Sequence, residues 1–288
     1  MKKPDFQIPH SPHDVRLADY DPGSNGGFDD KDDASTTLKS DIEKLDALQD
    51  IFAAQTQHAL LIVLQGMDAA GKDGIVKHVM SGVNPSGVNV YSFRKPTEEE
   101  ERHDYLWRES KRLPERGRIA IFNRSYYEEV LVVRVLPQLL RDEGQAGESS
   151  KCWEHRYEDI NAFERHLTRC GTIVLKFFMH VSKEEQRSRL LKRLETPAKM
   201  YKASDADLAG HAAWDAYVKA YEEMLSATST PWAPWYAIPA DKKWVARAAV
   251  GGIIVETLEA LDLKYPEPSA GRRKLYASLA EQLHAEKD

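Results

Sequence analysis

Residues 66–73 read GMDAAGKD and fit the phosphate-loop pattern G-x-x-x-x-G-K. An unbroken apolar run of strand length, residues 59–64, comes directly before this loop, and apolar residues at helical spacing, such as Ile75 and Val79, follow it. In the order strand, loop and helix, backbone N–H groups and the helix N-terminus converge on an anion, and Lys72 adds a positive charge. The stretch predicts a phosphate site in an α/β fold, with a simple helix-capping turn as the alternative.

The loop ends in Asp73, whereas an ATP site with this pattern has Ser or Thr, whose hydroxyl holds Mg²⁺. Asp68 and Asp73 flank Lys72, and two carboxylates in a phosphate cradle repel the substrate unless a cation lies between them. Mg²⁺ is the natural cation for this position. Asp73 can alternatively be a first-turn acid that only stabilises the helix dipole. The loop is therefore predicted to bind phosphate without being a standard ATP site.

The chain has 288 residues, a size that suits one large α/β domain. Its two cysteines, Cys152 and Cys170, have the spacing of neither a zinc site nor a disulfide framework. No run approaches the ~18 apolar residues of a membrane span, and the N-terminus lacks the apolar segment of a secretory signal. The net charge of −6 argues against nonspecific binding of nucleic acid. These features predict a cytoplasmic protein.

Segments of strand and helix character alternate along most of the chain, which is typical of a parallel sheet with helices on both faces. The predicted strands are 59–65, 88–93, 117–123, 172–180 and 234–238. The predicted helices are 39–57, 72–81, 98–111, 125–136, 153–168, 182–196, 205–226 and 241–262. The segment 138–150 contains two glycines and is predicted to be a mobile loop.

The predicted strand 117–123 ends in Asn123, and the ligand crevice of an open parallel sheet lies outside the carboxyl ends of its strands. This strand end should therefore face the loop at Gly66. P-loop enzymes commonly have an acid here to hold metal-bound water, but Asn123 is uncharged. Glu128 can supply that carboxylate or be an ordinary first-turn acid. Arg124 can grip two phosphate oxygens or form a surface ion pair.

Seven basic residues against three acids lie in the segment 183–202, which indicates either an anion-binding surface or a solvated helix face. At 100° per residue, Arg187 falls on the side of the leucines of the helix 182–196, whereas Arg189 and Arg193 fall on the other side. An arginine on a core-facing stripe needs an anionic partner, because burying an unpaired charge is costly. That partner is either a buried carboxylate or a phosphoryl group in the cleft.

Arg94 and Lys95 follow the second predicted strand, where many nucleotide kinases receive the acceptor nucleotide, and they are predicted to hold its phosphate. We interpret Trp107 as a core residue, with a place in the base pocket as the alternative. The ten histidines show no metal-binding spacing, and no G-x-S-x-G nucleophile motif occurs.

Three blocks of sequence stand in order in the chain. They are GMDAAGKDG at 66–74, FNRSYYE at 122–128, and TST at 228–230 with APWY at 233–236 and PADKK at 239–243. Together they resemble the polyphosphate kinase 2 family over roughly residues 40–260. The resemblance implies a P-loop kinase fold similar to that of thymidylate kinase, a five-stranded parallel sheet with a helical lid. It also implies phosphoryl transfer between inorganic polyphosphate and a nucleotide without a covalent intermediate.

The same resemblance implies roles for single residues. The expected catalytic residues are Asp68, Lys72, Arg124, Glu128 and Arg187. The expected polyphosphate contacts are Ala69, Ala70, Gly71, Lys72, Asp73, Arg124, Arg187 and Arg193. Asn123 is an expected nucleotide contact, together with Arg94 and Lys95, which are predicted from their position after the second strand. Asp68 and Glu128 are the expected ligands of Mg²⁺, for which Mn²⁺ is a candidate substitute.

Many members of the family have Asp where this chain has Asn123. The Asn form, followed by Glu128, resembles the subgroup that phosphorylates both nucleoside monophosphates and diphosphates. Tyr201 stands where Trp is expected, and the pair Arg94 and Lys95 differs from the commoner pairing, which leaves the nucleotide preference open.

The predicted organisation has three parts. Residues 1–38 form an irregular N-terminal arm, residues 39–263 a phosphotransferase domain with a lid at about 182–204, and residues 264–288 a C-terminal extension. The expected partners are inorganic polyphosphate and nucleoside mono- and diphosphates, with no nucleic acid and no membrane. The family also implies a homo-oligomer, either a dimer or a tetramer.

The sequence therefore predicts a reversible polyphosphate kinase that acts on AMP and ADP, with GMP and GDP as further candidate acceptors. Two other functions stay open: an ATP-dependent nucleotide kinase of similar fold, which Asp73 disfavours, and a non-catalytic polyphosphate-binding protein. A structural role in an assembly is neither supported nor excluded.

Overall fold

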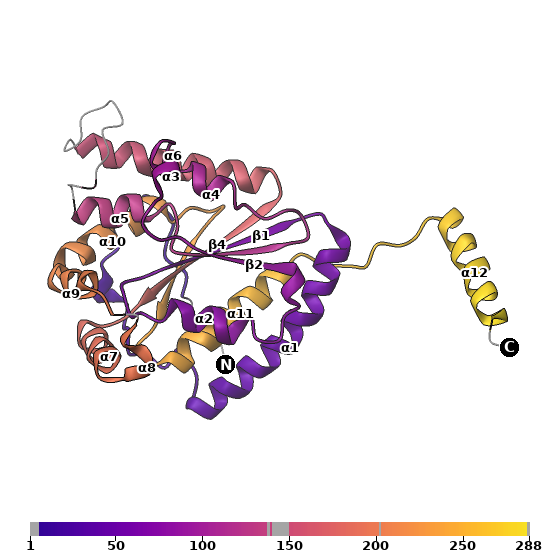
Figure 1. The fold of residues 1–288 in the computed structure, drawn as a ribbon, viewed down its shortest axis with the longest axis horizontal. Helices are drawn as coiled ribbons and strands as arrows, with labels where there is room; N and C mark the ends of the chain where they lie inside the picture. Colours follow the sequence, from indigo (N-terminus) through magenta and orange to yellow (C-terminus); the bar gives the residue numbers. More distant parts are fainter. Residues whose placement is uncertain (1–5, 137–138, 140–149, 202, 287–288) are drawn as a thin grey trace.

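The computed structural model describes residues 6–136, 139, 150–201 and 203–286. Its centre is a parallel sheet in the order β2-β3-β1-β4-β5 (Figure 1). In that order the strands are Val88–Ser92, Ile119–Asn123, Ala59–Gln65, Thr172–His180 and Trp235–Pro239. The five-stranded parallel sheet confirms the predicted fold class. The predicted loop 138–150 lies outside the described residues, apart from its residues 139 and 150.

The central strand β1 is buried along its whole length, because strands flank both of its edges and helices cover both faces of the sheet. Leu64 lies opposite Asn123 of β3 on one side and opposite Phe177 of β4 on the other. The carboxyl ends of β1 and β3 therefore lie side by side. The loop that follows β1 is thus next to Arg124, which directly follows β3.

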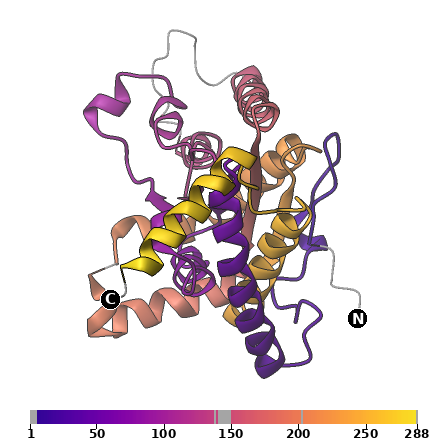
Figure 2. The same ribbon diagram turned by 90° about the vertical axis from the view of Figure 1, so that its right-hand side faces the viewer.

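Helices cover the two faces of the sheet in two layers (Figures 1 and 2). One layer consists of α1 (Lys31–Gln55), α2 (Lys72–Val79) and α11 (Lys243–Glu259), and the other of α5 (Glu128–Val135), α6 (Ser150–Arg169) and α10 (Trp214–Thr228). The helices α7 (Lys183–Glu195), α8 (Pro197–Met200) and α9 (Asp205–Ala212) follow β4 at the carboxyl end of the sheet, where a lid was expected. Two short helices, α3 (Glu98–Glu101) and α4 (Trp107–Ser110), connect β2 to β3.

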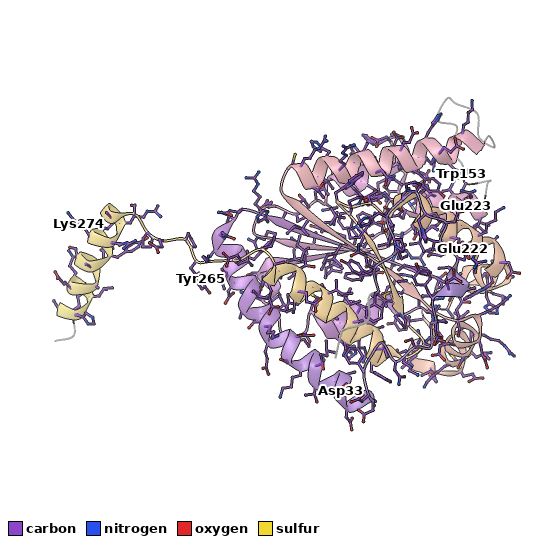
Figure 3. All side chains as sticks on the ribbon, turned by 180° about the vertical axis from the view of Figure 1, so that it is seen from behind. Asp33, Trp153, Glu222, Glu223, Tyr265 and Lys274 are labelled. Carbon is purple, nitrogen blue, oxygen red and sulfur yellow. The ribbon has the colours of Figure 1, made fainter. Side chains whose placement is uncertain are left out.

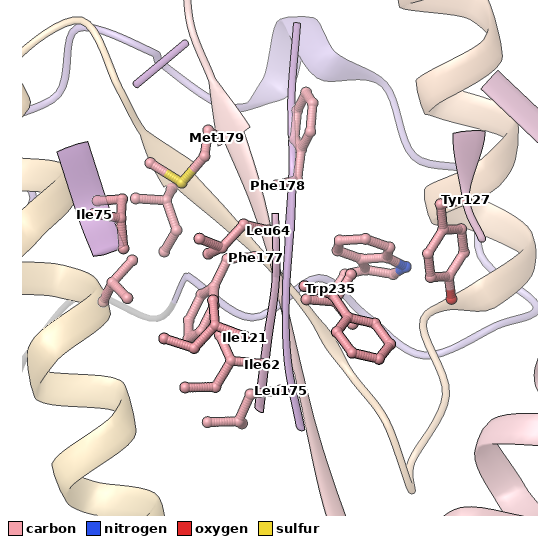
Figure 4. Close-up of a cluster of buried hydrophobic side chains, with 14 of the residues drawn as sticks. Ile62, Leu64, Ile75, Ile121, Tyr127, Leu175, Phe177, Phe178, Met179 and Trp235 are labelled. Atoms are coloured by element: carbon pink, nitrogen blue, oxygen red, sulfur yellow. The ribbon is translucent and has the colours of Figure 1, made fainter. Parts of the chain in front are cut away.

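The apolar core lies on both sides of the strands. Figure 4 shows Ile75, Ile121 and Phe177 on one side and Tyr127 and Trp235 on the other. All five side chains are buried. The aromatic side chains on the second side carry polar atoms, so this half of the core also needs hydrogen-bond partners.

Lys176 meets that need from the middle of β4, where its side chain is fully buried. Its Nζ donates to the hydroxyl of Tyr127 (2.8 Å), to Oε2 of Glu164 (2.6 Å) and to the carbonyl oxygen of Thr228 (2.7 Å). Oε1 of Glu164 accepts from the hydroxyls of Tyr126 and Tyr127, both at 2.8 Å. Each ammonium proton therefore has an acceptor, as a buried charge requires.

The N-terminal arm covers the outer edge of the sheet. The backbone N–H of Ile8 donates to the carbonyl of Trp235, and that of Ala237 donates to the carbonyl of Phe6, both at 2.8 Å. These contacts form an antiparallel rung on β5 within a stretch that was expected to be irregular. The rung occupies backbone groups that an exposed edge strand would otherwise offer to another chain.

Several element boundaries differ from the predicted ones. The first helix begins at Lys31 instead of residue 39, because the side chain of Asp30 caps it by accepting from two backbone N–H groups. The segment 98–111 forms two short helices with a turn at Asp104, and 205–226 forms two helices that separate at Ala213. The division of the chain at residues 38 and 263 stays a prediction.

The last element, α12 (Ala270–Ala285), was not predicted. It stands away from the rest of the molecule at the end of an extended segment (Figure 1). Figure 3 shows Tyr265 on that segment and Lys274 on the helix, both clear of the sheet and its helices. Within the described part of the chain, none of the helices combines the length and the apolar character that crossing a bilayer requires.

We expect Lys176→Met to lower the free energy of unfolding by about 3–5 kcal/mol, because it leaves the carboxylate of Glu164 buried without its cation. Adding Glu164→Gln to this variant should recover part of the loss, since no unpaired charge then remains. Urea unfolding of the wild type, both single variants and the double variant measures the coupling. If the loss of unfolding free energy in the double variant equals the sum of the losses in the two single variants, the two charges are not coupled.

Candidate active site

The phosphate loop turns sharply between β1 and α2, and three of its residues have a positive φ: Gly66 (152°), Ala69 (62°) and Gly71 (111°). A Cβ at Gly66 would lie 2.8 Å from the carbonyl oxygen of Met179, so a side chain does not fit there. Lys72 is the first residue of α2 and is buried. Its Nζ donates to the carbonyls of Gly66 (2.5 Å) and Met67 (3.2 Å). The predicted loop geometry is thus present.

Burial, and then the positive charge of Arg124, lower the pKa of Lys72 from 10.5 to about 8. The carboxylates of Asp68, Glu128 and Asp73 act in the opposite direction. A lysine with this pKa is mostly charged at neutral pH but loses its charge in mildly basic solution. The loop lysine is therefore a cation whose charge depends on the anions around it.

Arg124 lies between two carboxylates at the carboxyl end of β3. Its Nη2 donates to Oδ1 of Asp68 and its Nη1 to Oε2 of Glu128 at 3.1 Å. The carboxylate of Glu128, followed by that of Asp68, raises the pKa of Arg124, so its charge is permanent. Its φ of 65° is unusual for a residue with a side chain. The structure thus brings together Asp68, Arg124 and Glu128, as the sequence predicted.

The strained turn at Arg124 is held by the residues that follow it. Tyr126 and Tyr127 are both fully buried, and their hydroxyls bind Glu164 on the interior side. Arg124 and Glu128, on either side of this pair in sequence, are partly exposed in the cleft. The buried network around Lys176 therefore determines where the two catalytic candidates of this turn lie.

Asn123 also contacts the phosphate loop, since its Nδ2 donates to Oδ1 of Asp73 at 2.8 Å. Asn123 is buried, whereas Asp73 is exposed in the first turn of α2. An amide at position 123 can donate this hydrogen bond to a carboxylate, which an aspartate could not do without repulsion. Asn123 at the end of β3 and Asp73 at the start of α2 are thus a matched pair.

The cleft above the loop is lined from three sides. Its walls include Asp68, Arg124 and Glu128 near the loop, Gln186 and Gly210 from the lid helices, and Tyr217 and Tyr221 from α10. Burial, and then the negative charges of Glu128 and Asp68, raise the pKa of Tyr217 to about 12. Its hydroxyl is therefore a neutral hydrogen-bond donor in the cleft at physiological pH.

The lid helix α7 is joined to the loop through Arg189. Its Nη1 donates to the carbonyls of Ala69 (3.0 Å) and Ala70 (2.9 Å), and its Nη2 to those of Ala240 (2.6 Å) and Asp241 (2.9 Å). Nε2 of Gln186 donates to the carbonyl of Asp68 at 3.1 Å. These contacts hold the lid to the loop through backbone carbonyls, so they do not use the loop's own N–H groups.

The predicted orientation of α7 was wrong. Arg187 is exposed, and so are Leu191 and Leu194 on the same side of the helix. The opposite side, with Gln186 and Arg189, packs on the loop. The helix belongs to a lid that covers polar backbone groups instead of an apolar core, so its leucines do not mark the inner side.

The other sequence-predicted residues lie at the rim of the site. Arg193 is held by Oδ2 of Asp207 at 2.7 Å, which ties α7 to α9. Arg94 and Lys95 are exposed just beyond β2, and the carbonyl of Arg94 accepts from Nη1 of Arg108 at 2.9 Å. Trp107 is not a core residue, because it is only half-buried and stacks on His103 with the ring centroids 3.7 Å apart.

Sequence reasoning missed Arg189, Gln186 and the pair Lys176–Glu164. Lys176 offered a usable signal, because it is a single charged residue in the otherwise apolar run 173–179 of a strand that was expected to be buried. Such a residue implies a buried acidic partner. No comparable signal marked Arg189, since it lies among many basic residues of α7.

Asp68 and Glu128 form an arrangement that fits a metal ion, because both carboxylates reach the same guanidinium and thus point to one region. Among the described residues there is no group of three or more metal-ligating side chains. Two carboxylates together with water and substrate phosphate oxygens are the donor set that Mg²⁺ commonly uses in phosphoryl-transfer sites.

Because the pKa of Lys72 is about 8, we expect the affinity for short-chain polyphosphate to fall as the pH rises from 7 to 9. The neutral amine formed above the pKa no longer attracts the anion. Calorimetric titration with tripolyphosphate measures the change. The variant Lys72→Arg stays charged throughout this range and is the matched control. An equal pH dependence in both proteins would contradict the assignment to Lys72.

The family model described as Polyphosphate kinase 2 (PPK2) matches residues 28–266 of the chain. The chain is 48% identical over 259 residues to the ADP-polyphosphate phosphotransferase of Rhodopseudomonas palustris, a match that covers 89% of this chain and 90% of that protein. It is 46% identical over 263 residues to the AMP/ADP-polyphosphate phosphotransferase of Meiothermus ruber, covering 90% and 94% of the two.

The fold is also similar to that of solved structures. The crystal structure of polyphosphate kinase 2 from Arthrobacter aurescens matches with a TM-score of 0.85 and 38% sequence identity over 95% of both chains. A family match over most of the length, together with relatives well above 30% identity, confirms the resemblance seen in the motifs. The chain belongs to the polyphosphate kinase 2 family.

Proposed function

We propose that the protein is a phosphotransferase that transfers a phosphoryl group between inorganic polyphosphate and AMP or ADP, reversibly, with GMP and GDP as further acceptors. The observation that carries the proposal is the convergence of Lys72, Arg124, Asp68 and Glu128 above a phosphate loop that has Asp73 in place of a hydroxyl residue. Two cations and two carboxylates at one point suit a reaction between polyanions that needs a metal ion.

In this proposal, an oxygen of the acceptor phosphate attacks the terminal phosphorus of polyphosphate in line. The bond between that phosphorus and its bridging oxygen breaks, and the polyphosphate leaves shorter by one unit. The backbone N–H groups of Ala69, Ala70 and Gly71 hold the chain at the N-terminus of α2, and that of Ala70 exchanges its hydrogen bond to the carbonyl of Met67 (3.1 Å) for one to a phosphate oxygen. Lys72 and Arg124 neutralise charge on the transferred group, so catalysis is mostly positioning and electrostatic stabilisation.

The lid supplies the outer contacts. We assign Arg187, which is exposed on α7, and Arg193, which is held by Asp207, to contacts with the polyphosphate chain. The exposure of Arg187 supports this role, because an arginine without burial is free to reach a ligand. Arg189 is excluded from it, since its guanidinium is occupied by four backbone carbonyls.

Kinases of this family generally need a divalent metal ion. We propose that this ion is Mg²⁺, with Mn²⁺ as a substitute, and that Asp68 and Glu128 are its protein ligands. The ion would neutralise the phosphate oxygens and orient them for in-line attack. Both carboxylates now bind Arg124, so the same two groups that hold the metal also position the guanidinium.

We propose Asn123, Arg94 and Lys95 as contacts of the acceptor nucleotide. Arg94 and Lys95 lie exposed at the end of β2, where their charges can reach an acceptor phosphate. Use of both AMP and ADP rests on Asn123 and on the similarity to the Meiothermus ruber protein, whose name includes both acceptors. A cytoplasmic location and self-association also stay proposals; cell fractionation and sedimentation test them.

A donor test separates this function from its rivals. ADP incubated with long-chain polyphosphate and Mg²⁺ should yield ATP, and AMP should yield ADP and then ATP. If the nucleotides are phosphorylated only when ATP is the donor, the protein is the ATP-dependent kinase instead. Polyphosphate binding without turnover of AMP, ADP, GMP or GDP identifies a binding protein. Quantifying the nucleotides by ion-exchange chromatography distinguishes the three outcomes.

Replacing the loop lysine or the turn arginine should abolish turnover while the protein stays folded. We expect Lys72→Ala and Arg124→Ala each to lower kcat by at least about a hundredfold, since each removes charge stabilisation from the transferring group. Lys77→Ala, on an exposed position of the same helix as Lys72, is the matched control and should keep full activity. Circular dichroism checks the fold. A folded Lys72→Ala protein with normal kcat would refute the assignment.

A further inference from the structure

The terminal helix α12 makes no use of its apolar side within the chain. Every residue from Lys264 to Glu286 is exposed. The large apolar side chains of the helix remain 44–66% exposed: Leu275, Tyr276, Leu279 and Leu283. Isolated helices of about this length are marginally stable in water, and most helices gain their stability by packing an apolar face. The helix therefore lacks, within the described chain, a surface against which its apolar side can pack.

These side chains form a single stripe. At 100° per residue, Leu275, Leu279, Leu283 and Tyr276 fall within an arc of about 100°. Arg272 and Glu286 fall within the same arc, one at each end of the stripe. The stripe thus has an apolar centre with a cation at its N-terminal end and an anion at its C-terminal end.

The helix is also held away from its own domain. Pro266 and Pro268 lie in the segment that connects α11 to α12, where they favour an extended backbone. Arg273 fixes the start of the helix to this segment by donating to the carbonyl of Pro268 (2.9 Å) and to Oε2 of Glu267 (2.7 Å). Figures 1 and 3 show the helix apart from the sheet and its covering layers. The stripe is therefore presented outward.

The charges of the stripe are placed unfavourably for an isolated helix. The N-terminus of a helix carries a partial positive charge and the C-terminus a partial negative one, so Arg272 and Glu286 each lie at the end of like sign. Neither side chain has an ion pair among the described residues. A partner that brings a carboxylate to Arg272 and a cation to Glu286 removes both conflicts.

A second, antiparallel copy of the same helix has this arrangement. If Leu279 lies on a twofold axis, Leu275 comes opposite Leu283, and Arg272 comes opposite Glu286 of the partner copy. The twofold axis repeats each contact, and the two helix dipoles then oppose each other favourably. The stripe is thus complementary to itself in apolar pattern, in charge and in register.

We propose that α12 is a dimerisation arm that pairs antiparallel with α12 of a second copy of this chain, centred on Leu279. The proposal names the segment behind the self-association suggested above, and it does not depend on the phosphotransferase activity. Two helices of 16 residues bury less area than a standard stable interface. The expected dissociation constant of the pair is therefore in the micromolar range.

Charge reversal tests the pairing in the full-length protein. Arg272→Glu places two pairs of like charges in the dimer, and Glu286→Arg does the same with the opposite sign. We expect each single variant to weaken dimerisation by about tenfold. The double variant Arg272→Glu/Glu286→Arg restores both ion pairs and should have the dissociation constant of the wild-type dimer. Sedimentation equilibrium over a range of protein concentrations measures all four proteins.

The double variant is decisive, because recovery requires the two positions to meet across the interface. Unchanged association in the single variants, or a double variant as weak as the singles, would overturn the proposal. The proposal also fails if the wild type sediments as a monomer at every concentration. Phosphotransferase activity should be the same in all four proteins, which separates this result from any failure of the proposed function.

A cysteine placed on the twofold axis tests the antiparallel pairing independently. In a background with Cys152→Ser and Cys170→Ser, Leu279→Cys should form a disulfide-linked dimer under mild oxidation, since the residue meets its own copy. Ala277→Cys lies on the opposite side of the helix and is the matched control, which should stay monomeric on a non-reducing gel. Equal cross-linking of both variants, or none at Leu279→Cys, contradicts the twofold pairing.

Discussion

The buried ion pair between Lys176 and Glu164 is the constraint on which the active-site turn depends. A charged pair inside the core persists only if every polar atom has a partner, and here the partners are Tyr126, Tyr127 and the carbonyl of Thr228. The network therefore joins β4 to α5, α6 and the end of α10. Because the two tyrosines directly follow Arg124, fixing their hydroxyls fixes the strained backbone that directs the guanidinium into the cleft.

The cleft contains positive and negative side chains that neutralise one another. Arg124 lies between Asp68 and Glu128, and Lys72 lies beneath them with a lowered pKa. The same carboxylates that suit a metal ion thus also balance the cations that a polyanionic substrate requires. Arg189 lies outside this centre, because its guanidinium binds the carboxylate of Glu185 and four backbone carbonyls, two of them in the loop, and so holds the lid in place.

Motifs with local geometry were predictable. The loop 66–73 follows from glycine placement, and the strands β1, β3, β4 and β5 follow from apolar runs that a parallel sheet buries. The side of α7 that faces inward was not predictable, because its leucines suggested a core that the lid does not contain. Helix breaks at Asp104 and Ala213 were also missed, since the surrounding residues have helical character. At Asp104 the break is local, because its side chain accepts from the backbone N–H of Leu106 at 3.0 Å.

The sequence by itself determined the fold class, the phosphate loop and the resemblance to polyphosphate kinase 2, because each rests on short stretches whose pattern or motif is local, even where several such stretches are needed. Only the tertiary structure decided which charges meet. The contacts of Asp68 with Arg124, of Asn123 with Asp73, and of Lys176 with Glu164 all join different elements. Such contacts depend on strand order and on burial, which a linear pattern does not contain.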